Sequence, residues 1–260
     1  MEQLFVSANP FTIPLWIAGL AFFLVARSGR RYRLVGWMFV VPFALFLVAQ
    51  GRSYYLGPAY PMLLAAGAVA GESWMGSLRP AWARLARGLT AAALVVGAAL
   101  GGALMLPIAP VGSDLWNITS AVHDNFVEQV GWPELVETVA GIYAALPAEQ
   151  RARTAILAGN YGEAGAVNLY GPAHDLPQGI SGVNSYWPRG YGEPPPETLI
   201  VLGFRRDAVD RLFESCHHVG RVSNPYGIQN EEARDHPDIF LCGSPRQPWP
   251  DIWRELRRFG

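Results

Sequence analysis

Charged side chains are scarce in this sequence. Asp, Glu, Lys and Arg make up 16% of its 260 residues, whereas an ordinary soluble domain carries about a quarter. The shortage is confined to one half of the chain. Residues 11–108 are mostly apolar with their charges in clusters, and from Asp114 onward acidic and basic residues occur at ordinary densities. We therefore expect a membrane region over residues 1–109 and a globular domain over residues 110–260.

Two further features are missing. The formal net charge is −1, so the chain lacks the basic excess that a nucleic-acid partner requires. The first nine residues carry no basic segment, and no small-residue cleavage site follows the first apolar stretch. Neither a nucleic-acid-binding function nor a cleaved secretory signal is therefore expected.

Four apolar stretches have the composition of membrane spans. A helix that crosses the hydrocarbon core needs about 20 residues, with a range of roughly 17 to 25. The first two stretches are short, so we expect them to include flanking residues such as Phe5 and Tyr32. Four buried helices of a soluble protein are the alternative, which the scarcity of charge disfavours. The predicted spans are residues 9–26, 34–50, 56–75 and 89–108.

The arginines in the connections predict which way the spans run. The connection between the second and third spans carries only Arg52, whereas the other two connections are rich in arginine. Arginine-rich connections stay in the cytoplasm, so an even number of crossings places the C-terminal domain on the outer side. We expect a multi-pass protein of the cell (inner) membrane with an extracytoplasmic domain. The cytoplasmic arginines are Arg27, Arg30, Arg31, Arg33, Arg79, Arg84 and Arg87.

The outer connection combines a cation with aromatic side chains. Arg52 stands just before Tyr54 and Tyr55, and Pro58 and Pro61 should break or kink the start of the third span. A guanidinium group offers phosphate oxygens a planar fork of donors and stays charged, so this connection is suited to hold a lipid phosphate. The alternative is an interfacial anchor, in which Tyr and Arg extend to the lipid headgroups.

Helix and strand patterns alternate beyond residue 110. The clearest strand is the continuous apolar run at residues 198–204. Such alternation predicts a small α/β domain, built as a two-layer or three-layer sandwich. The predicted helices cover residues 114–143, with Pro133 opening a second helix over 134–146, and then 167–170, 207–216 and 251–259; the other predicted strands are 154–158 and 239–242.

A glycine-rich turn follows the strand at residues 154–158. Its spacing, G-x-x-G-x-x-G, differs from the G-x-G-x-x-G of dinucleotide sites, and no acidic residue closes a second strand about 20 residues later. A dinucleotide site is therefore disfavoured. One interpretation is a tight strand-to-helix turn with Asn160 and Glu163 facing a shallow site. The other is plain turn chemistry.

Cys216 and Cys242 are the only cysteines, and both fall in the domain placed outside the cytoplasm. An oxidising compartment favours a disulfide, which would close a loop of about 26 residues and stabilise the domain by about 3 kcal/mol. A zinc site with His217, His218 or His236 is the alternative, but the spacing fits no standard ligand pattern. We predict neither a metal site nor a recognisable catalytic triad.

Three parts of the sequence resemble bacterial members of glycosyltransferase family 39, which includes the protein mannosyltransferases and the aminoarabinose transferase that modifies lipid A. The first is GRSYYLGPAYP at residues 51–61, leading into AAGA at 65–68. The second is AGNYGEAGA at 158–166 together with ISGVNSYW at 180–187, and the third is CGSPRQPW at 242–249 followed by Trp253. The likeness extends from about residue 10 to the end of the chain.

The resemblance implies an integral-membrane enzyme that moves a sugar from a polyprenyl-phosphate donor to an acceptor on the outer face of the membrane. Arg52 stands where many relatives carry a Lys before the paired tyrosines. Together with Tyr54 and Tyr55 it is expected to face the donor phosphate and to neutralise charge on the leaving group. The candidate site residues of the outer domain are Asn160, Tyr161, Glu163, Asn184 and Tyr186.

The chain also departs from the family's pattern. Relatives carry essential acidic residues in a first outer loop, several spans before anything present here, where a carboxylate acts as general base. We therefore expect no catalytic residue in this chain, which would be inactive without an N-terminal half. Residues 186–190 read YWPRG, where relatives usually have a Trp-Gly-Pro stretch. No cofactor is predicted, and a divalent metal stays open for the full enzyme.

The expected partners are membrane lipid, the lipid-linked donor and the N-terminal half of the same enzyme. Two other functions compete with the transferase. The first is a non-catalytic, membrane-anchored binding or accessory domain. The second is a fragment of a solute transporter, whose spans usually carry charges near the midplane; the predicted spans carry only Glu72, close to an inner end.

Overall fold

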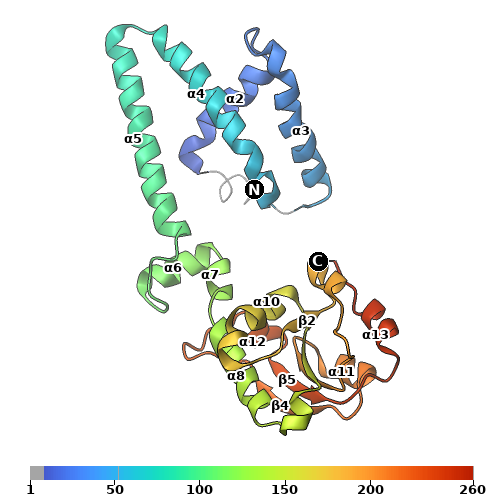
Figure 1. Ribbon diagram of the computed structural model, residues 1–260. Helices are drawn as coiled ribbons and strands as arrows, with labels where there is room; N and C mark the ends of the chain where they lie inside the picture. Colours follow the sequence, from blue (N-terminus) through green and yellow to red (C-terminus); the bar gives the residue numbers. More distant parts are fainter. Residues whose placement is uncertain (1–8, 52, 260) are drawn as a thin grey trace. The chain divides into compact units, whose positions relative to one another are not determined.

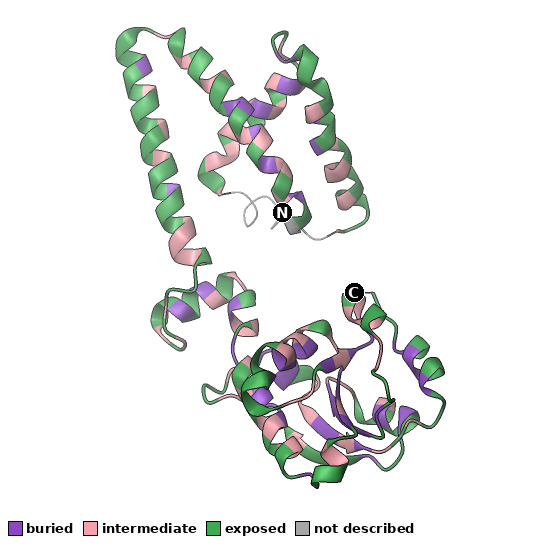
Figure 2. Ribbon diagram, viewed as in Figure 1, coloured by how far each residue is buried: buried purple, intermediate pink, exposed green. Residues whose placement is uncertain are grey.

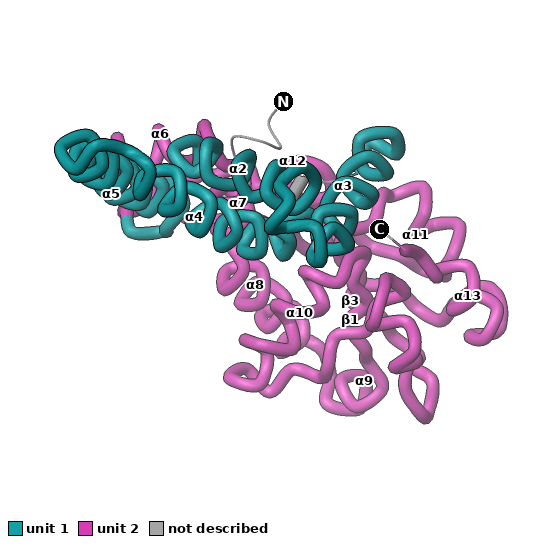
Figure 3. Tube along the Cα trace, turned by 90° about the horizontal axis from the view of Figure 1, so that it is seen from above, with its two compact units in different colours: residues 1–108 teal, residues 109–260 magenta. Residues whose placement is uncertain are grey.

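The structure is a computed structural model that describes residues 9–51 and 53–259 (Figure 1). The chain divides into two compact units, residues 1–108 and residues 109–260 (Figure 3). The first unit is mostly helical, and the second contains a five-stranded mixed sheet with helices. A helical region followed by a small α/β domain is thus the architecture of the chain.

Within residues 9–51 and 53–108, four α-helices cover most of the predicted spans. The helix α5 begins earlier than predicted, so Arg84 and Arg87 lie in its first turns and not in a connecting loop. Pro58 lies in a 3-10 helix, and Pro61 stands in the first turn of the helix after it, as the predicted break requires. The elements are η1 (Pro10–Thr12), α2 (Ile13–Leu24), η2 (Arg30–Tyr32), α3 (Arg33–Val48), η3 (Ser53–Ala59), α4 (Tyr60–Gly76) and α5 (Pro80–Met105).

Two of these segments, residues 30–48 and 80–105, are long and apolar enough to cross a membrane. Only 11% and 6% of their most apolar stretches are buried, and most of α3 and α5 is coloured as exposed or intermediate in Figure 2. The core helix of a soluble protein buries its apolar side chains, so this exposure fits an apolar solvent. The helix α2, with 12 residues, falls short of the usual span length, and α4, with 17 residues, lies at its lower limit.

Glycines let α2 and α4 cross at backbone distance. A Cβ atom on Gly19 would overlap the carbonyl of Leu63, and one on Gly67 would overlap the carbonyl of Leu15. Small residues at a crossing are the usual way for helices to pack closely in a membrane. Phe39 and Tyr60 are buried beside this crossing, with their ring centres 5.7 Å apart.

One ion pair joins α4 to α5. The Arg87 guanidinium donates to both carboxylate oxygens of Glu72, with distances of 3.2 Å from Nε and 2.5 Å from an Nη atom. Glu72 is the acidic residue within the predicted spans, so its charge is matched inside the helical unit. Glu72 lies near the end of α4 and Arg87 near the start of α5, so the pair is close to the connection between the two helices.

The second unit is built on a sheet with strand order β2-β1-β3-β5-β4. The neighbours β2, β1 and β3 run parallel, whereas β5 is antiparallel to both β3 and β4. The apolar runs of β1, β3 and β5 were predicted. Two strands were missed: β2, which has three residues, and β4, an edge strand with mostly exposed polar residues. The strands are β1 (Thr154–Ala158), β2 (Gly179–Ser181), β3 (Thr198–Leu202), β4 (His217–Arg221) and β5 (Asp238–Cys242).

Helices cover both faces of the sheet and make a three-layer sandwich. Alternate residues of β3 enter the two cores: Leu199 and Val201 pack with α11 and α13, and Ile200 and Leu202 pack with α8 and α10. All four side chains are fully buried, which explains why this strand reads as a continuous apolar run. The helices are α6 (Asp114–Val122), α7 (Asn125–Glu128), α8 (Trp132–Ala144), α9 (Ala148–Arg151), α10 (Tyr161–Tyr170), α11 (Arg206–Leu212), α12 (Glu231–Asp235) and α13 (Trp249–Glu255), with 3-10 helices η4 (Gly171–His174) and η5 (Asn184–Arg189).

Backbone turns correct three helix predictions. The helix expected over residues 114–143 is broken into α6, α7 and α8, because His123 is extended and Gly131 has a φ of 102°. The helix expected to reach Cys216 ends at Leu212, three residues before Ser215, whose φ is 50°. The C-terminal helix ends at Glu255, short of the predicted Phe259.

Cys216 and Cys242 form a disulfide. Cys216 directly precedes β4 and Cys242 ends β5, and the antiparallel register pairs His217 with Leu241. The two cysteines are therefore facing neighbours, with their Cα atoms 4.1 Å apart. Because a disulfide has no thiolate, a zinc site that uses these cysteines is excluded. Residues 9–51 and 53–259 contain no group of three His, Cys, Asp or Glu side chains able to hold a metal ion.

We expect the disulfide to stabilise the α/β domain of residues 109–260. Replacing both cysteines by serine removes the cross-link from the unfolded chain and should lower the free energy of unfolding by about 3 kcal/mol. Urea unfolding of the purified chain measures this difference. Intact-mass analysis after alkylation provides the chemical check: alkyl groups should add only after reduction, and two thiols free in unreduced material would contradict the assignment.

Candidate functional site

The carboxyl ends of β1 and β3 lie at the point in the sheet where the connections from these two neighbouring strands lead to opposite sides. From β1 the chain passes through α10 to β2 on one side, and from β3 it passes through α11 toward β4 and β5 on the other. Such a point often forms a ligand crevice. Here the backbones meet closely, because a Cβ atom on Gly159 would overlap the carbonyl of Gly203.

The glycine-rich turn after β1 is a capping box. The side-chain oxygen of Asn160 accepts a hydrogen bond from the Glu163 N–H at 2.8 Å. The Glu163 carboxylate in turn accepts from the N–H groups of Gly159 and Asn160, at 3.0 and 3.3 Å. These bonds satisfy the free N–H donors at the start of α10. The polar side chains of Asn160 and Glu163, which were predicted to face a shallow site, therefore form hydrogen bonds within the turn.

A second carboxyl group lies beside this turn. The Asn160 amide donates to Oε1 of Glu232, which comes from α12, at 3.4 Å. Glu163 and Glu232 are only 1% and 6% exposed, and Oε2 of Glu232 has no hydrogen-bond partner within the described part of the chain. Burial, followed by the nearby Glu232 charge, raises the pKa of Glu163 to about 8. Burial also raises the pKa of Glu232.

This pair of carboxyl groups is sealed from solvent. Burial favours the neutral forms, and a group that is 1% exposed cannot reach a substrate without rearrangement. The neighbouring Tyr161 is 54% exposed. The pair therefore acts on the stability of the domain, and the accessible chemistry of this unit lies elsewhere.

A groove of about 600 Å³ opens at the other end of the parallel strands. It lies along the starts of β1 and β2 and is walled by the segment that connects η5 to β3. We call it the polar groove, because amide, guanidinium, carboxylate and phenol groups line it. The lining side chains that matter here are Arg153, Asn168, Gln178, Tyr186, Arg189, Tyr191, Glu193 and Glu197.

One wall of the polar groove is joined to α10. The side-chain amide of Asn168 donates to the Tyr186 hydroxyl at 3.3 Å, and its oxygen accepts the N–H of Gly179 at 2.7 Å. The Arg189 guanidinium lies over the Tyr186 ring, 4.4 Å from its centre. Asn168 thus fixes both the start of β2 and the position of an aromatic side chain in the groove.

The other wall is supported by α13. Tyr191 stacks on Trp249 with ring centres 4.9 Å apart, and the Trp249 indole N–H donates to the Pro196 carbonyl. Trp187 and Trp253 each donate an indole N–H to the other's backbone carbonyl, at 2.9 and 3.0 Å. These contacts hold the segment between η5 and β3 in place. They give the tryptophans of the C-terminal motif a positioning role.

The ionisable side chains that line the polar groove balance in charge. Arg153 donates to both oxygens of Glu197, at 2.9 and 2.8 Å. Arg189 and Glu193 supply one further charge of each sign. The lining contains no His, Cys or Asp. The groove thus offers a ligand hydrogen-bonding and aromatic groups, and one of its two carboxylates, that of Glu197, is already paired with Arg153.

The five candidate residues of the α/β domain do not come together in one site. Asn160, Tyr161 and Glu163 lie at the carboxyl end of β1, whereas Tyr186 lines the polar groove near its amino end. Asn184 has a φ of 52°, and its N–H donates to the carbonyl of Arg258, which ties η5 to the C-terminal segment.

Sequence reasoning missed most of the polar groove. Asn168, Arg189 and Tyr191 are the important omissions, and each comes from a different local setting. For Arg189 and Tyr191, the sequence does contain a signal of a structured loop. Glycines at 190 and 192, both with positive φ, flank Tyr191, and three prolines follow at residues 194–196. Such a stretch makes a rigid loop, which is suited to present side chains.

The residues predicted to hold the donor phosphate are described only in part. Arg52 lies outside the described residues, and so does the side chain of Tyr54. Tyr55 is half exposed, and its ring centre is 5.8 Å from that of Phe46 on α3. The structure therefore leaves the role of Arg52 as a prediction.

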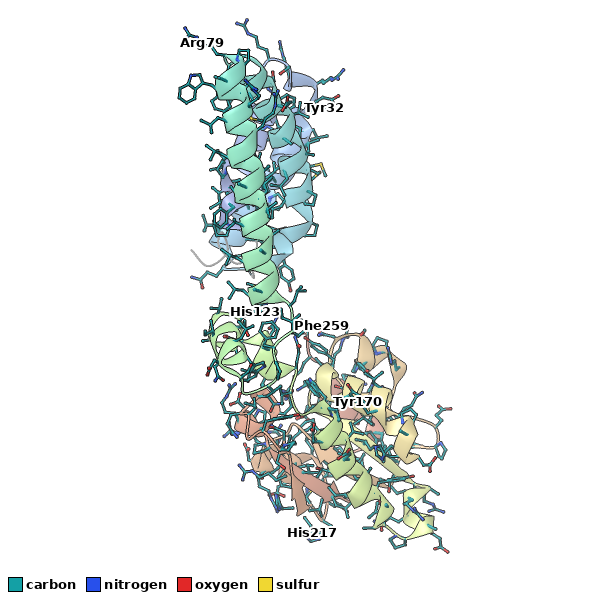
Figure 4. The ribbon with its side chains drawn as sticks, turned by 90° about the vertical axis from the view of Figure 1, so that its left-hand side faces the viewer. Tyr32, Arg79, His123, Tyr170, His217 and Phe259 are labelled. Carbon is teal, nitrogen blue, oxygen red and sulfur yellow. A yellow bond between two sulfur atoms is a disulfide. The ribbon has the colours of Figure 1, made fainter. Side chains whose placement is uncertain are left out.

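The helical unit has its own cleft between α2, α3 and α4. Its volume is about 1150 Å³, and its lining is mostly apolar, with Arg31 and Tyr32 among the lining residues. Figure 4 shows Tyr32 at the same end of the unit as Arg79. An apolar cleft with a cation at one end suits a lipid chain and its headgroup.

Comparison with known proteins gives no relative. No family model, no curated protein and no solved structure matches this chain.

Proposed function

We propose that this chain is the C-terminal portion of an integral-membrane glycosyltransferase. The enzyme would move a sugar from a polyprenyl-phosphate donor to an acceptor at the outer face of the inner membrane. The observation that carries the proposal is the joining of exposed apolar helices to a disulfide-bonded α/β domain through residues 106–113. The three sequence segments that resemble glycosyltransferase family 39 are the second support.

The proposal assigns four spans to the helical unit. The segment of residues 30–48, which joins η2 to α3, and the helix α5 are each long enough to cross. For α2 and α4 we infer spans that include the adjoining 3-10 turns, because the two helices pack at backbone distance through Gly19 and Gly67. Arginine-rich connections then stay in the cytoplasm, and the disulfide-bonded domain lies in the oxidising compartment.

Arg52 tests the proposal. In the complete enzyme, reconstituted in vesicles with a polyprenyl-phosphate sugar, Arg52→Ala should lower sugar transfer by at least about tenfold, because the leaving phosphate loses a matched cation. Arg52→Lys should keep most of the activity, since relatives carry a Lys there. Release of the donor's polyprenyl phosphate and labelling of the acceptor measure the transfer.

Arg30→Ala is the matched control, because it removes the same charge from a predicted cytoplasmic connection. It should leave transfer within about twofold, as a surface charge far from the reaction contributes little. Equal activity of Arg52→Ala and the wild-type enzyme would remove Arg52 from the donor site.

A second candidate is a membrane-anchored binding domain without catalysis. The observation in its favour is the polar groove, whose lining has no His, Cys or Asp, together with the burial of Glu163 in a capping box. The same vesicle assay separates the two candidates. Failure of the complete wild-type protein to transfer sugar would favour the binding domain.

A further inference from the structure

We propose that the polar groove of the outer domain binds a short, neutral saccharide chain. Its volume of about 600 Å³ lies within the range of small-molecule sites. The inference rests on the outer domain alone, so it holds for either candidate function.

The chemistry of the lining favours a polyhydroxylated ligand. Tyr186 and Tyr191 combine an apolar ring with a hydroxyl group, and the amides of Asn168 and Gln178 both donate and accept hydrogen bonds. A sugar ring needs this combination, since its hydroxyl groups are donors and acceptors and its C–H face is apolar. A purely apolar ligand would make no use of the hydrogen-bonding capacity of these half-buried and exposed groups.

The charge of the lining argues against an anionic ligand. Arg153 is paired with Glu197 through two hydrogen bonds, and Arg189 stands in the same groove as Glu193. Sites for phosphate or sulfate present an excess of cationic donors. Because its two arginines are balanced by two glutamates, the groove attracts neither anions nor cations strongly. A ligand with neutral hydroxyl groups fits this lining best.

Contacts within the domain position the aromatic side chains of the polar groove. Tyr186 is positioned by Asn168, and Tyr191 is stacked on Trp249. The reciprocal bonds between Trp187 and Trp253 fix the segment that carries Arg189. A preformed site loses little conformational entropy on binding, which matters for weak ligands such as sugars.

The test uses the full chain in lipid nanodiscs, because many common detergents carry sugar headgroups. The probes are maltotriose, cellotriose, mannotriose and chitotriose, with inorganic phosphate as the anionic comparison. Saturation-transfer NMR and tryptophan fluorescence report binding, the latter because Tyr191 stacks on Trp249. We expect at least one trisaccharide to bind with a Kd below about 1 mM and phosphate not to compete.

The exposed residue Arg189 provides the key variant. Arg189→Gln removes the guanidinium group from the Tyr186 ring and should weaken saccharide binding by at least about fivefold. Arg205→Gln, at an exposed arginine outside the groove, is the matched control and should bind as the wild type does. Unchanged thermal unfolding of both variants shows that the fold is intact.

Three results would overturn the inference: no binding of any of the four trisaccharides, displacement of a bound trisaccharide by phosphate, or equal binding by Arg189→Gln and the wild type. None of these depends on sugar transfer by the complete enzyme, so the inference and the proposed function can fail separately.

Discussion

The free energy of unfolding of the C-terminal α/β domain should fall by on the order of 4 kcal/mol between about pH 5 and about pH 9. The group responsible is Glu163, whose pKa is raised from its ordinary value of 4.5 to about 8 in the folded protein. Across this interval the folded state keeps a proton that the unfolded state has released. Stability is therefore complete below about pH 4.5 and is lost at about 1.4 kcal/mol per pH unit as the pH rises toward 8.

The cause is burial together with a neighbouring acid. Glu163 is 1% exposed, and Glu232 and Glu231 add negative charge nearby. The N–H groups of Gly159 and Asn160 favour the carboxylate, but they offset burial only in part. Glu232 adds to the trend, because burial, with Glu128 and Glu231 nearby, raises its pKa too. Deprotonation at high pH places uncompensated charge between β1 and α12, which the fold tolerates poorly.

Glu163→Gln should remove most of this pH dependence. A glutamine side chain is neutral at every pH and still offers an oxygen to the N–H groups of Gly159 and Asn160. The variant should resemble the wild type near pH 5 and exceed its stability near pH 9. Urea unfolding of the full chain, followed by tryptophan fluorescence at several pH values, measures both effects.

Glu137→Gln on α8 is the control, because Glu137 is exposed. It should keep the wild-type slope. A wild-type outer domain whose unfolding free energy does not change between about pH 5 and about pH 8 would show that Glu163 ionises normally, and the burial argument would then be wrong.

The turn around Glu163 has one feature that the sequence predicts and one that it does not. Asn160 followed by Glu163 is a local capping pattern, and the strand before it is a continuous apolar run. Both could be predicted. The burial of Glu163 could not, because Glu232 arrives from α12, 69 residues later in the chain. Nothing local in the sequence states which distant helix covers a turn.

The polar groove was harder to predict from the sequence than the turn around Glu163. It combines Asn168 from α10, Tyr186 and Arg189 from η5 and Tyr191 from a loop, and it lies beside the strand β2. That strand has three residues, too few for an alternating pattern. Because β2 was not predicted, the sheet edge that forms the floor of the groove could not be placed. The long apolar strand β3, by contrast, was found from its sequence alone.

In the helical unit, too, the contacts between elements could not be predicted from the local sequence. Apolar stretches and arginine clusters indicated the helices and their connections. The crossing of α2 and α4 depends on Gly19 and Gly67 meeting a partner backbone. A Cβ atom on Gly57, Gly71, Gly76 or Gly88 would meet nothing within 4 Å, and Gly71 lies on the same helix as Gly67. The sequence alone does not distinguish Gly67 from Gly71, because the difference between them is the contact of Gly67 with the backbone of the partner helix.

Gly67→Ala should therefore disrupt the helical unit, at a cost on the order of 4 kcal/mol or more. Its new Cβ atom would overlap backbone atoms of Leu15, which no side-chain rotation can relieve. The helices must separate, and the packing of Phe39 and Tyr60 beside the crossing is lost with them. The melting temperature of the chain in a detergent without sugar headgroups, followed by circular dichroism, measures the loss.

Gly71→Ala is the matched control, since it makes the same change one helical turn later. A Cβ atom there has no neighbour within 4 Å, so the substitution should be neutral or should raise stability by up to about 1 kcal/mol through helix propensity. Gly19→Ala should behave like Gly67→Ala, because it overlaps the Leu63 carbonyl from the other side of the crossing. Equal melting temperatures for Gly67→Ala and Gly71→Ala would mean that α2 and α4 do not cross at backbone distance.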